Sequence, residues 1–136
     1  MRTLDDCYKK GLKLIDSDAV SARNCLISAA SHLDDAEASF NIKRYRLTLT
    51  SSYEAMFHAA KALLFMDGVK EHSHICVPVY LREAHPDLEE YANTLDAYRL
   101  FREKATYGFG VNVSGIEAKA ALENAKLIIE KIQALI

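Results

Sequence analysis

The sequence predicts an all-α protein, an antiparallel bundle of about five to six helices in a single domain that spans residues 1–136. Three observations support this fold class. Apolar residues recur every three or four positions through most of the chain, which places them on one face of a helix. Only two prolines and five glycines are present, too few to supply the turns of a chain built from many short strands. Half of the residues are apolar and 26% are charged, so the chain can bury a core of its own.

The first predicted helix runs from about residue 3 to residue 15 and is an extra N-terminal helix within residues 1–16. Thr3 and Asp6 have the spacing of a capping box, in which two side chains satisfy backbone N–H groups at a helix start. A second helix is predicted over about residues 19–42. Its apolar residues alternate steps of four and three, as is typical of a helix packed against another helix. They are Ala22, Leu26, Ala29, Leu33, Ala36 and Phe40.

A third, longer helix is predicted from about residue 44 to residue 66. Gly68 is expected to end it, because glycine tolerates the left-handed backbone conformation found after many helices. Residues 69–73 then read as a polar loop. A short apolar helix over about residues 74–83 follows this loop.

The fifth predicted helix spans about residues 86–107 and starts with a proline, which suits the first turn of a helix. Gly108 and Gly110 then break the chain. Ser114 and Glu117 form a second capping box, which opens the last helix. Helices with such short links and narrow apolar faces pack as an antiparallel bundle, and apolar surface left over after this packing predicts a homodimer.

The charge and hydropathy of the chain argue against two classes of protein, those that bind nucleic acid by bulk charge and those that span a membrane. The net charge is −2 and the pI is near 6.2, which argues against binding of nucleic acid by bulk charge alone, since such domains usually have a pI above about 9. Basic residues nevertheless gather within residues 9–13, 43–46 and 99–104. These clusters are either solvated faces or parts of a groove for a phosphate backbone. No apolar run approaches the roughly 20 residues that span a bilayer, and the N-terminus is too polar for a signal peptide, so we expect a cytoplasmic protein.

The three cysteines, Cys7, Cys25 and Cys76, are far apart in sequence and do not have the spacing of metal ligands. Cys7 and Cys25 fall at apolar helical positions, where cysteine behaves as a small hydrophobic residue. We therefore expect all three cysteines to be reduced, as is usual for scattered cysteines in the cytoplasm.

Two stretches resemble the HEPN domain family of small prokaryotic proteins. The first is Ser-Tyr-Glu-Ala-Met-Phe-His-Ala-Ala-Lys-Ala-Leu-Leu at residues 52–64, followed by Gly68 and by His-Ser-His at residues 72–74. The second, Arg-Glu-Lys-Ala-Thr-Tyr-Gly at residues 102–108, is similar to the arginine-led motif of that family. The resemblance covers about residues 22–136. It implies a bundle of four to five helices, a homodimer and, often, a minimal nucleotidyltransferase as partner.

The same resemblance implies two kinds of activity. Many HEPN proteins resemble ribonucleases of toxin–antitoxin or defence systems, and others resemble non-catalytic binders of nucleotides or RNA. Catalytic members carry an arginine and a histidine separated by four to six residues, but the residues at this spacing from Arg102 are Tyr107, Gly108 and Phe109, and Arg99 has no histidine there either. Cleavage without a metal needs a group that exchanges protons near neutral pH, which histidine provides and an ordinary tyrosine does not. The motif therefore keeps a phosphate-binding arginine and lacks the proton shuttle.

Arg102 lies on a mostly apolar helix face, where a charge needs a partner because burying it unpaired is costly. It binds a phosphate, forms a salt bridge to Asp96, Glu54 or Glu103, or lies at the edge of the apolar face with its charged group in water. Tyr107, at the end of the same helix, is either a core aromatic residue or one that contacts a nucleotide or is modified by a nucleotidyltransferase.

His58 is either a structural residue on a packed helix or a residue that faces the groove of Arg102 and replaces the missing histidine. His72 and His74 are separated by one residue in a loop, so both could reach a common ligand. A His-x-His pair alone is weak support for a metal site, which needs further ligands, and we expect neither a metal nor a cofactor.

The leading hypothesis is a HEPN-type nucleotide- or RNA-binding homodimer that acts with a minimal nucleotidyltransferase in a toxin–antitoxin or stress-defence system, without a complete ribonuclease motif. One alternative is a metal-independent ribonuclease with a degenerate motif, in which Arg102 and His58 are the catalytic candidates. The other is a structural scaffold protein. The predicted binding residues are Arg102, Tyr107, Arg99, His58, Tyr53, His72 and His74.

Overall fold

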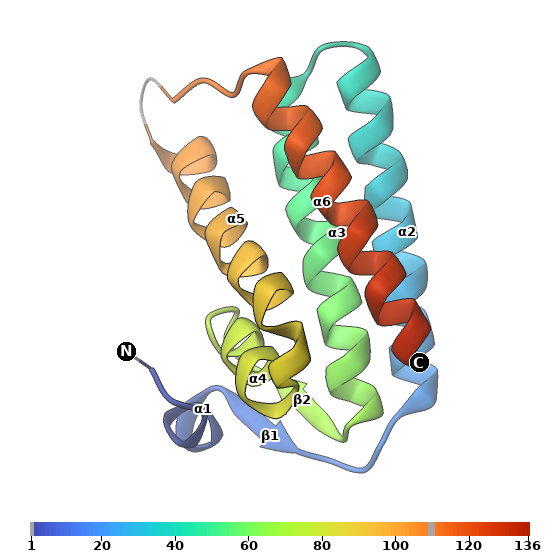
Figure 1. Ribbon diagram of the computed structural model, residues 1–136, viewed down its shortest axis with the longest axis vertical. Coiled ribbons are helices and arrows are strands. Elements are labelled where there is room, and N and C mark those ends of the chain that lie inside the picture. The colour runs from blue at the N-terminus through green and yellow to red at the C-terminus, as the bar shows by residue number, and fades with distance from the viewer. Residues whose placement is uncertain (1, 109–110) are drawn as a thin grey trace.

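A computed structural model describes residues 2–108 and 111–136, so that the predicted chain break at Gly110 lies outside the described residues. Within these ranges the chain forms six α-helices and two very short strands, which confirms the predicted all-α bundle. Three long helices lie side by side: α2 (Ala19–Asn41), α3 (Tyr45–Met66) and α6 (Gly115–Leu135). Figure 1 shows α5 (Glu89–Tyr107) next to them, with the short elements gathered at one end of the bundle.

The α3 helix is the centre of the core, because it packs against α2, α5 and α6 and is buried along most of its length. Its fully buried side chains include Leu49, Tyr53, Met56 and Leu64. The α2 helix begins where the Asp18 side chain accepts a hydrogen bond from the Ser21 N–H. Because α2, α5 and α6 all pack on α3, residues that are distant in sequence lie close together around this helix.

The N-terminal segment differs from the prediction. Helix α1 spans only Leu4–Lys10, and its capping box at Thr3 and Asp6 is present as predicted. The predicted continuation to residue 15 is wrong, because strand β1 (Leu12–Leu14) follows and pairs antiparallel with β2 (Val69–Glu71). Three-residue strands are too short to show a sequence periodicity, and their pairing joins distant parts of the chain. The predicted loop over residues 69–73 accordingly begins as a strand.

The predicted reduced state is wrong for two of the three cysteines. Cys7 on α1 forms a disulfide with Cys76 at the start of α4 (Cys76–Ala84), with their Cα atoms 5.7 Å apart, whereas Cys25 is free and buried. Separation in sequence says nothing about which cysteines a fold brings together, and α1 packs against α4. The packing around this disulfide requires glycine at position 11, because a Cβ there would lie 2.6 Å from the Cys76 Sγ.

The remaining helix ends follow the prediction closely. Gly68 has a φ of 79°, the left-handed conformation expected after α3. The segment that starts at Pro86 forms a single 3-10 turn, η1 (Pro86–Leu88), before α5 begins at Glu89. The Ser114–Glu117 capping box opens α6 as predicted. No helix in the described part of the chain is both long and apolar enough to cross a membrane.

Candidate functional site

A groove lies between the C-terminal turns of α5 and the loop that joins β2 to α4. Its volume is about 760 Å³. It is lined by Ser73, His74, Ile75, Arg99, Arg102, Glu103, Lys104, Tyr107 and Gly108. Four of the seven predicted binding residues, Arg99, Arg102, His74 and Tyr107, therefore share one groove, and a fifth, Tyr53, lies beneath it.

Arg102 lies across the buried aromatic ring of Tyr53. The central carbon of its guanidinium is 5.2 Å from the ring centroid, which is the geometry of a cation–π contact. The Arg102 Nε is buried and has no hydrogen-bond partner among the described residues, and no carboxylate there lies within salt-bridge distance of the guanidinium. Because a buried donor without a partner is costly, Arg102 is suited to accept an anionic ligand.

Two of the three salt-bridge partners predicted for Arg102, Asp96 and Glu103, pair with Arg99 instead, and the third, Glu54, pairs with His58. The Arg99 guanidinium lies 3.0 Å from the Asp96 Oδ1 and 3.5 Å from the Glu103 Oε1. Asp96 and Glu103 each lie about one turn from Arg99 on α5, where side chains three and four residues apart meet. The two carboxylates thus hold Arg99 in place and leave the charge of Arg102 unpaired.

Tyr53 connects the arginine to the histidine-bearing loop. Its hydroxyl lies 3.3 Å from the Nδ1 of His74, and the His74 ring stacks on Phe57 with a centroid distance of 4.0 Å. Burial raises the pKa of Tyr53 to about 12, an effect that the positive charge of Arg102 opposes. Tyr53 is therefore a neutral phenol that orients His74.

The rim of the groove contains Lys104 and Tyr107, both exposed. Tyr107 has 76% of its surface accessible, so its interpretation as a core aromatic residue is wrong. A ring that projects from the last turn of α5 at the edge of a groove can stack on a flat ligand. The rim thus adds a positive charge and an aromatic face to the arginine beneath.

His72 and His58 lie outside this groove. The His72 N–H donates a hydrogen bond to the Gly11 carbonyl oxygen at 2.8 Å, and its side chain lines a second groove beside Lys9 and Lys10 on α1. His58 belongs to the face of α3 that meets α2, where its ring stacks on that of His32 at a centroid distance of 5.1 Å. Burial and the neighbouring His32 lower the pKa of His58.

Sequence reasoning did not single out Phe57 or His32. Phe57 is four residues after Tyr53 on α3, and this spacing places both rings on one face of the helix. His32 carries no local signal, because its neighbours on α3 are distant in sequence. Only the packing of α2 on α3 brings it to Glu54 and His58.

The chain is thus a small helical domain whose central helix places the aromatic ring of Tyr53 under an arginine. Residues 22–135 match the HEPN domain model, and the chain belongs to the HEPN domain family. The chain is also similar to a UPF0332 protein from Archaeoglobus fulgidus, with 28% identity over 102 residues that cover 73% of this chain and 82% of the relative. The resemblance found in the sequence is thereby confirmed.

Proposed function

We propose that this chain is a nucleotide- or RNA-binding module whose ligand occupies the groove between α5 and the β2–α4 loop. The observation that carries the proposal is the unpaired guanidinium of Arg102, which lines the groove and keeps a buried Nε without a partner among the described residues. A phosphate in the groove would pair with the Arg102 guanidinium through its planar set of N–H groups, which arginine uses for bidentate anion binding.

The charges around Arg102 favour a phosphate over a neutral ligand. Arg99 and Lys104 lie in the same groove and add positive charge, which Asp96 and Glu103 reduce only in part. This is a local basic site on a chain of net charge −2. We therefore expect binding of one or a few phosphates, and not of a long duplex through many charge contacts.

The aromatic residues favour a ligand that also carries a base. The exposed ring of Tyr107 stands at the rim, and the His74 ring is held by Phe57 and Tyr53. Proteins bind single-stranded RNA by stacking unpaired bases on such rings. The ligand class is thus a nucleotide or a short single-stranded RNA.

We extend the proposal to a homodimer that works with a minimal nucleotidyltransferase in a toxin–antitoxin or stress-defence system. Support for a protein–protein surface comes from exposed aliphatic side chains on α2 and α6: Val20, Ile27, Ile116 and Leu127 are all more than half accessible. Exposed apolar side chains on neighbouring helices are typical of interaction surfaces. Light scattering coupled to gel filtration tests the dimer, and co-purification with the product of an adjacent nucleotidyltransferase gene tests the partner.

A second function, metal-independent RNA cleavage, is favoured by one observation. His74 lies in the same groove as Arg102. It precedes Arg102 in sequence, whereas the family motif has the histidine four to six residues after the arginine, so His74 is not part of that motif. Imidazoles exchange protons near neutral pH, which cleavage through the 2′-hydroxyl needs. The structure thus offers a histidine for this reaction from the β2–α4 loop.

Binding is tested by fluorescence anisotropy with a labelled single-stranded RNA and with competing nucleoside triphosphates. Arg102→Ala should weaken binding about 10- to 100-fold, because a hydrogen bond to a charged group contributes about 1.5–3 kcal/mol. Arg23→Ala, at an exposed position of α2, is the matched control and should bind like the wild type. Equal affinities of the wild type and Arg102→Ala would refute the proposed site.

Cleavage is tested by incubating structured and single-stranded RNAs with protein in EDTA. The binding-module hypothesis predicts that the wild type leaves the RNA intact. Cleavage by the wild type that is lost in both Arg102→Ala and His74→Gln would establish the ribonuclease instead. Cleavage that persists in both variants would show a contaminating nuclease.

A further inference from the structure

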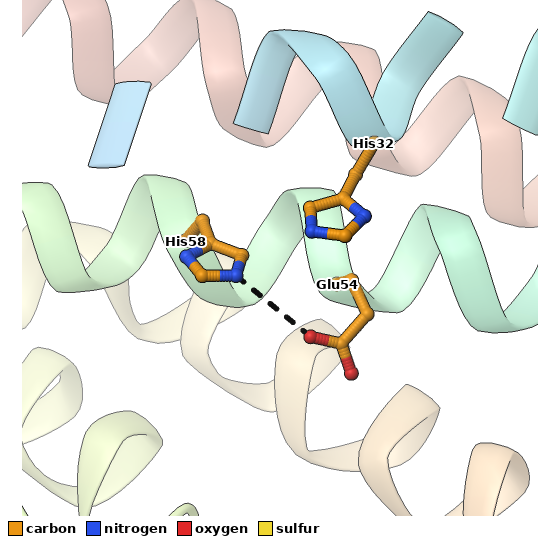
Figure 2. A group of neighbouring side chains, drawn as sticks. All are labelled: His32, Glu54 and His58. Carbon is orange, nitrogen blue, oxygen red and sulfur yellow. Dashed lines mark ion pairs between the residues drawn. The ribbon is translucent and has the colours of Figure 1, made fainter. Parts of the chain in front are cut away.

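A cluster of three possible metal ligands lies between α2 and α3, away from the groove. Figure 2 shows His32 on one helix pointing toward Glu54 and His58 on the other. One ligand atom from each residue lies within 4.8 Å of the other two. Within residues 2–108 and 111–136 it is the one group of at least three His, Cys, Asp or Glu side chains with this proximity.

The helices explain why these side chains converge. Glu54 and His58 are four residues apart on α3 and so lie on the same face, one turn apart. The α2 helix packs along that face and contributes His32. The two imidazole planes are nearly parallel, with an interplanar angle of 10°, and the Glu54 Oε2 lies 3.9 Å from the His58 Nε2.

The contacts within the cluster leave its ligand atoms available. The distance of 3.9 Å between Glu54 and His58 is too long for a hydrogen bond. All three residues are half-buried, so an ion can enter from solvent and still be enclosed on the protein side. The described residues thus place two imidazoles and a carboxylate together, and the one pairing among them is the long Glu54–His58 ion pair drawn as a dashed line in Figure 2.

We propose that His32, Glu54 and His58 bind one divalent transition-metal ion, with Zn²⁺ as the reference ion. Imidazole nitrogens suit Zn²⁺, Co²⁺, Ni²⁺ and Fe²⁺, whereas Mg²⁺ and Ca²⁺ prefer sets of oxygen ligands. Two histidines and one carboxylate are also a ligand set that leaves a coordination position for water. The site therefore selects transition metals and keeps an open position.

Binding requires a closure of the side chains and a rotation of the two rings, because each nitrogen lone pair lies in its ring plane and the two planes are nearly parallel. Bonds of about 2.0–2.2 Å in a tetrahedral site put the ligand atoms about 3.3–3.6 Å apart. The largest separation in the cluster, 4.8 Å, exceeds this by little more than an ångström. Rotation of the long Glu54 side chain and of the two rings can supply that movement, since each residue is half-buried.

This site is independent of the proposed RNA or nucleotide binding. Neither Arg102 nor Tyr107 belongs to the cluster. The bound ion would link α2 to α3 beside Phe57, whose ring meets that of His58 edge-on at a centroid distance of 6.0 Å. Metal binding should therefore raise the melting temperature even of a variant that has lost Arg102.

The test titrates metal-free, untagged protein with Zn²⁺ by calorimetry and with Co²⁺ by its visible absorption. We expect one ion per chain, at least tenfold weaker binding in His32→Gln, Glu54→Gln and His58→Gln, and no comparable binding of Mg²⁺. His72→Gln replaces an exposed histidine outside the cluster and should bind metal like the wild type. Absence of one-to-one binding, or an equal loss in His72→Gln, would overturn the proposal.

A second measurement on the wild type guards against variants that fail to fold. Nitrogen-15 spectra of the imidazole side chains, recorded during the Zn²⁺ titration, should show large shifts at His32 and His58. The signals of His72, His74 and His85 should stay in place. Shifts confined to these last three histidines would assign the metal elsewhere and refute the site.

Discussion

Reduction of the Cys7–Cys76 disulfide is expected to destabilise the protein strongly. Dithiothreitol breaks the bond and leaves the same side chains in the same fully buried positions, so packing changes little. The main effect is on the unfolded chain, which loses a cross-link. This makes reduction a cleaner change than replacement of either cysteine.

The magnitude follows from the loop that the disulfide closes. The two cysteines are 69 residues apart in sequence, and the chain-entropy account gives about 4 kcal/mol for a loop of this length at 25 °C. Small domains have a total free energy of unfolding of about 5–15 kcal/mol. The disulfide thus accounts for a large share of the stability of the oxidised protein.

The assay is urea unfolding of oxidised and reduced protein, followed by circular dichroism. With a slope of about 2 kcal/mol per molar urea, the midpoint of the reduced protein should be about 2 M lower. Cys7→Ala cannot form the disulfide and should show the same midpoint with and without reductant. Thiol titration of the unfolded, unreduced wild type should detect Cys25 alone.

The reasoning would be refuted if all three thiols reacted in the unreduced protein, since the disulfide would then be absent. It would also be refuted if the disulfide were present and the two midpoints coincided. The second result would mean that the unfolded chain is already compact enough to gain little freedom on reduction.

Three further predictions concern stability. Gly68→Ala should lower the free energy of unfolding in urea by about 2 kcal/mol, because it strains a residue with φ of 79° and puts a Cβ 2.6 Å from the Ile15 carbonyl oxygen. An unchanged urea midpoint would contradict this prediction. Ser114→Ala should cost about 1 kcal/mol in the same assay, since it removes the side-chain acceptor of the Glu117 N–H, whereas Ser114→Asp, which keeps an acceptor, should cost less. Tyr53 has a folded-state pKa raised to about 12 from an ordinary 10.0, so its contribution is intact below pH 10 and is lost as the pH rises toward 12. Tyr53→Phe should therefore lose less stability than the wild type between pH 9 and pH 11.5, and equal losses would show that Tyr53 does not titrate in this way.

Local signals in the sequence predicted the long helices and their ends. The periodic apolar residues of α2, the glycine after α3 and the capping box at Ser114 each depend on neighbours within a few residues, and all are found in the structure. The β1–β2 pair and the Cys7–Cys76 disulfide depend on segments that are distant in sequence. No local pattern could reveal them.

The residues of the candidate site also divide into those that a local sequence signal indicated and those that only the fold brings together. Arg102 was singled out because a charge on an apolar helix face needs an explanation, and Tyr53 because it belongs to a motif. Helical spacing in the sequence favours Arg99 as the partner of Asp96 and Glu103, which are three residues before it and four residues after it. The prediction considered these carboxylates for Arg102, which is six residues from Asp96 and adjacent to Glu103. The sequence could not separate His74, which lines the groove, from His72, which lines another.

The small sheet joins the matched HEPN domain to the segment that precedes it. The HEPN match begins at residue 22, yet β1, which precedes it, pairs with β2, the strand that leads directly into the loop carrying His74. The groove is thus supported from outside the shared domain. Changes in the segment before residue 22 can therefore shift the position of His74 while every residue of the matched domain stays the same.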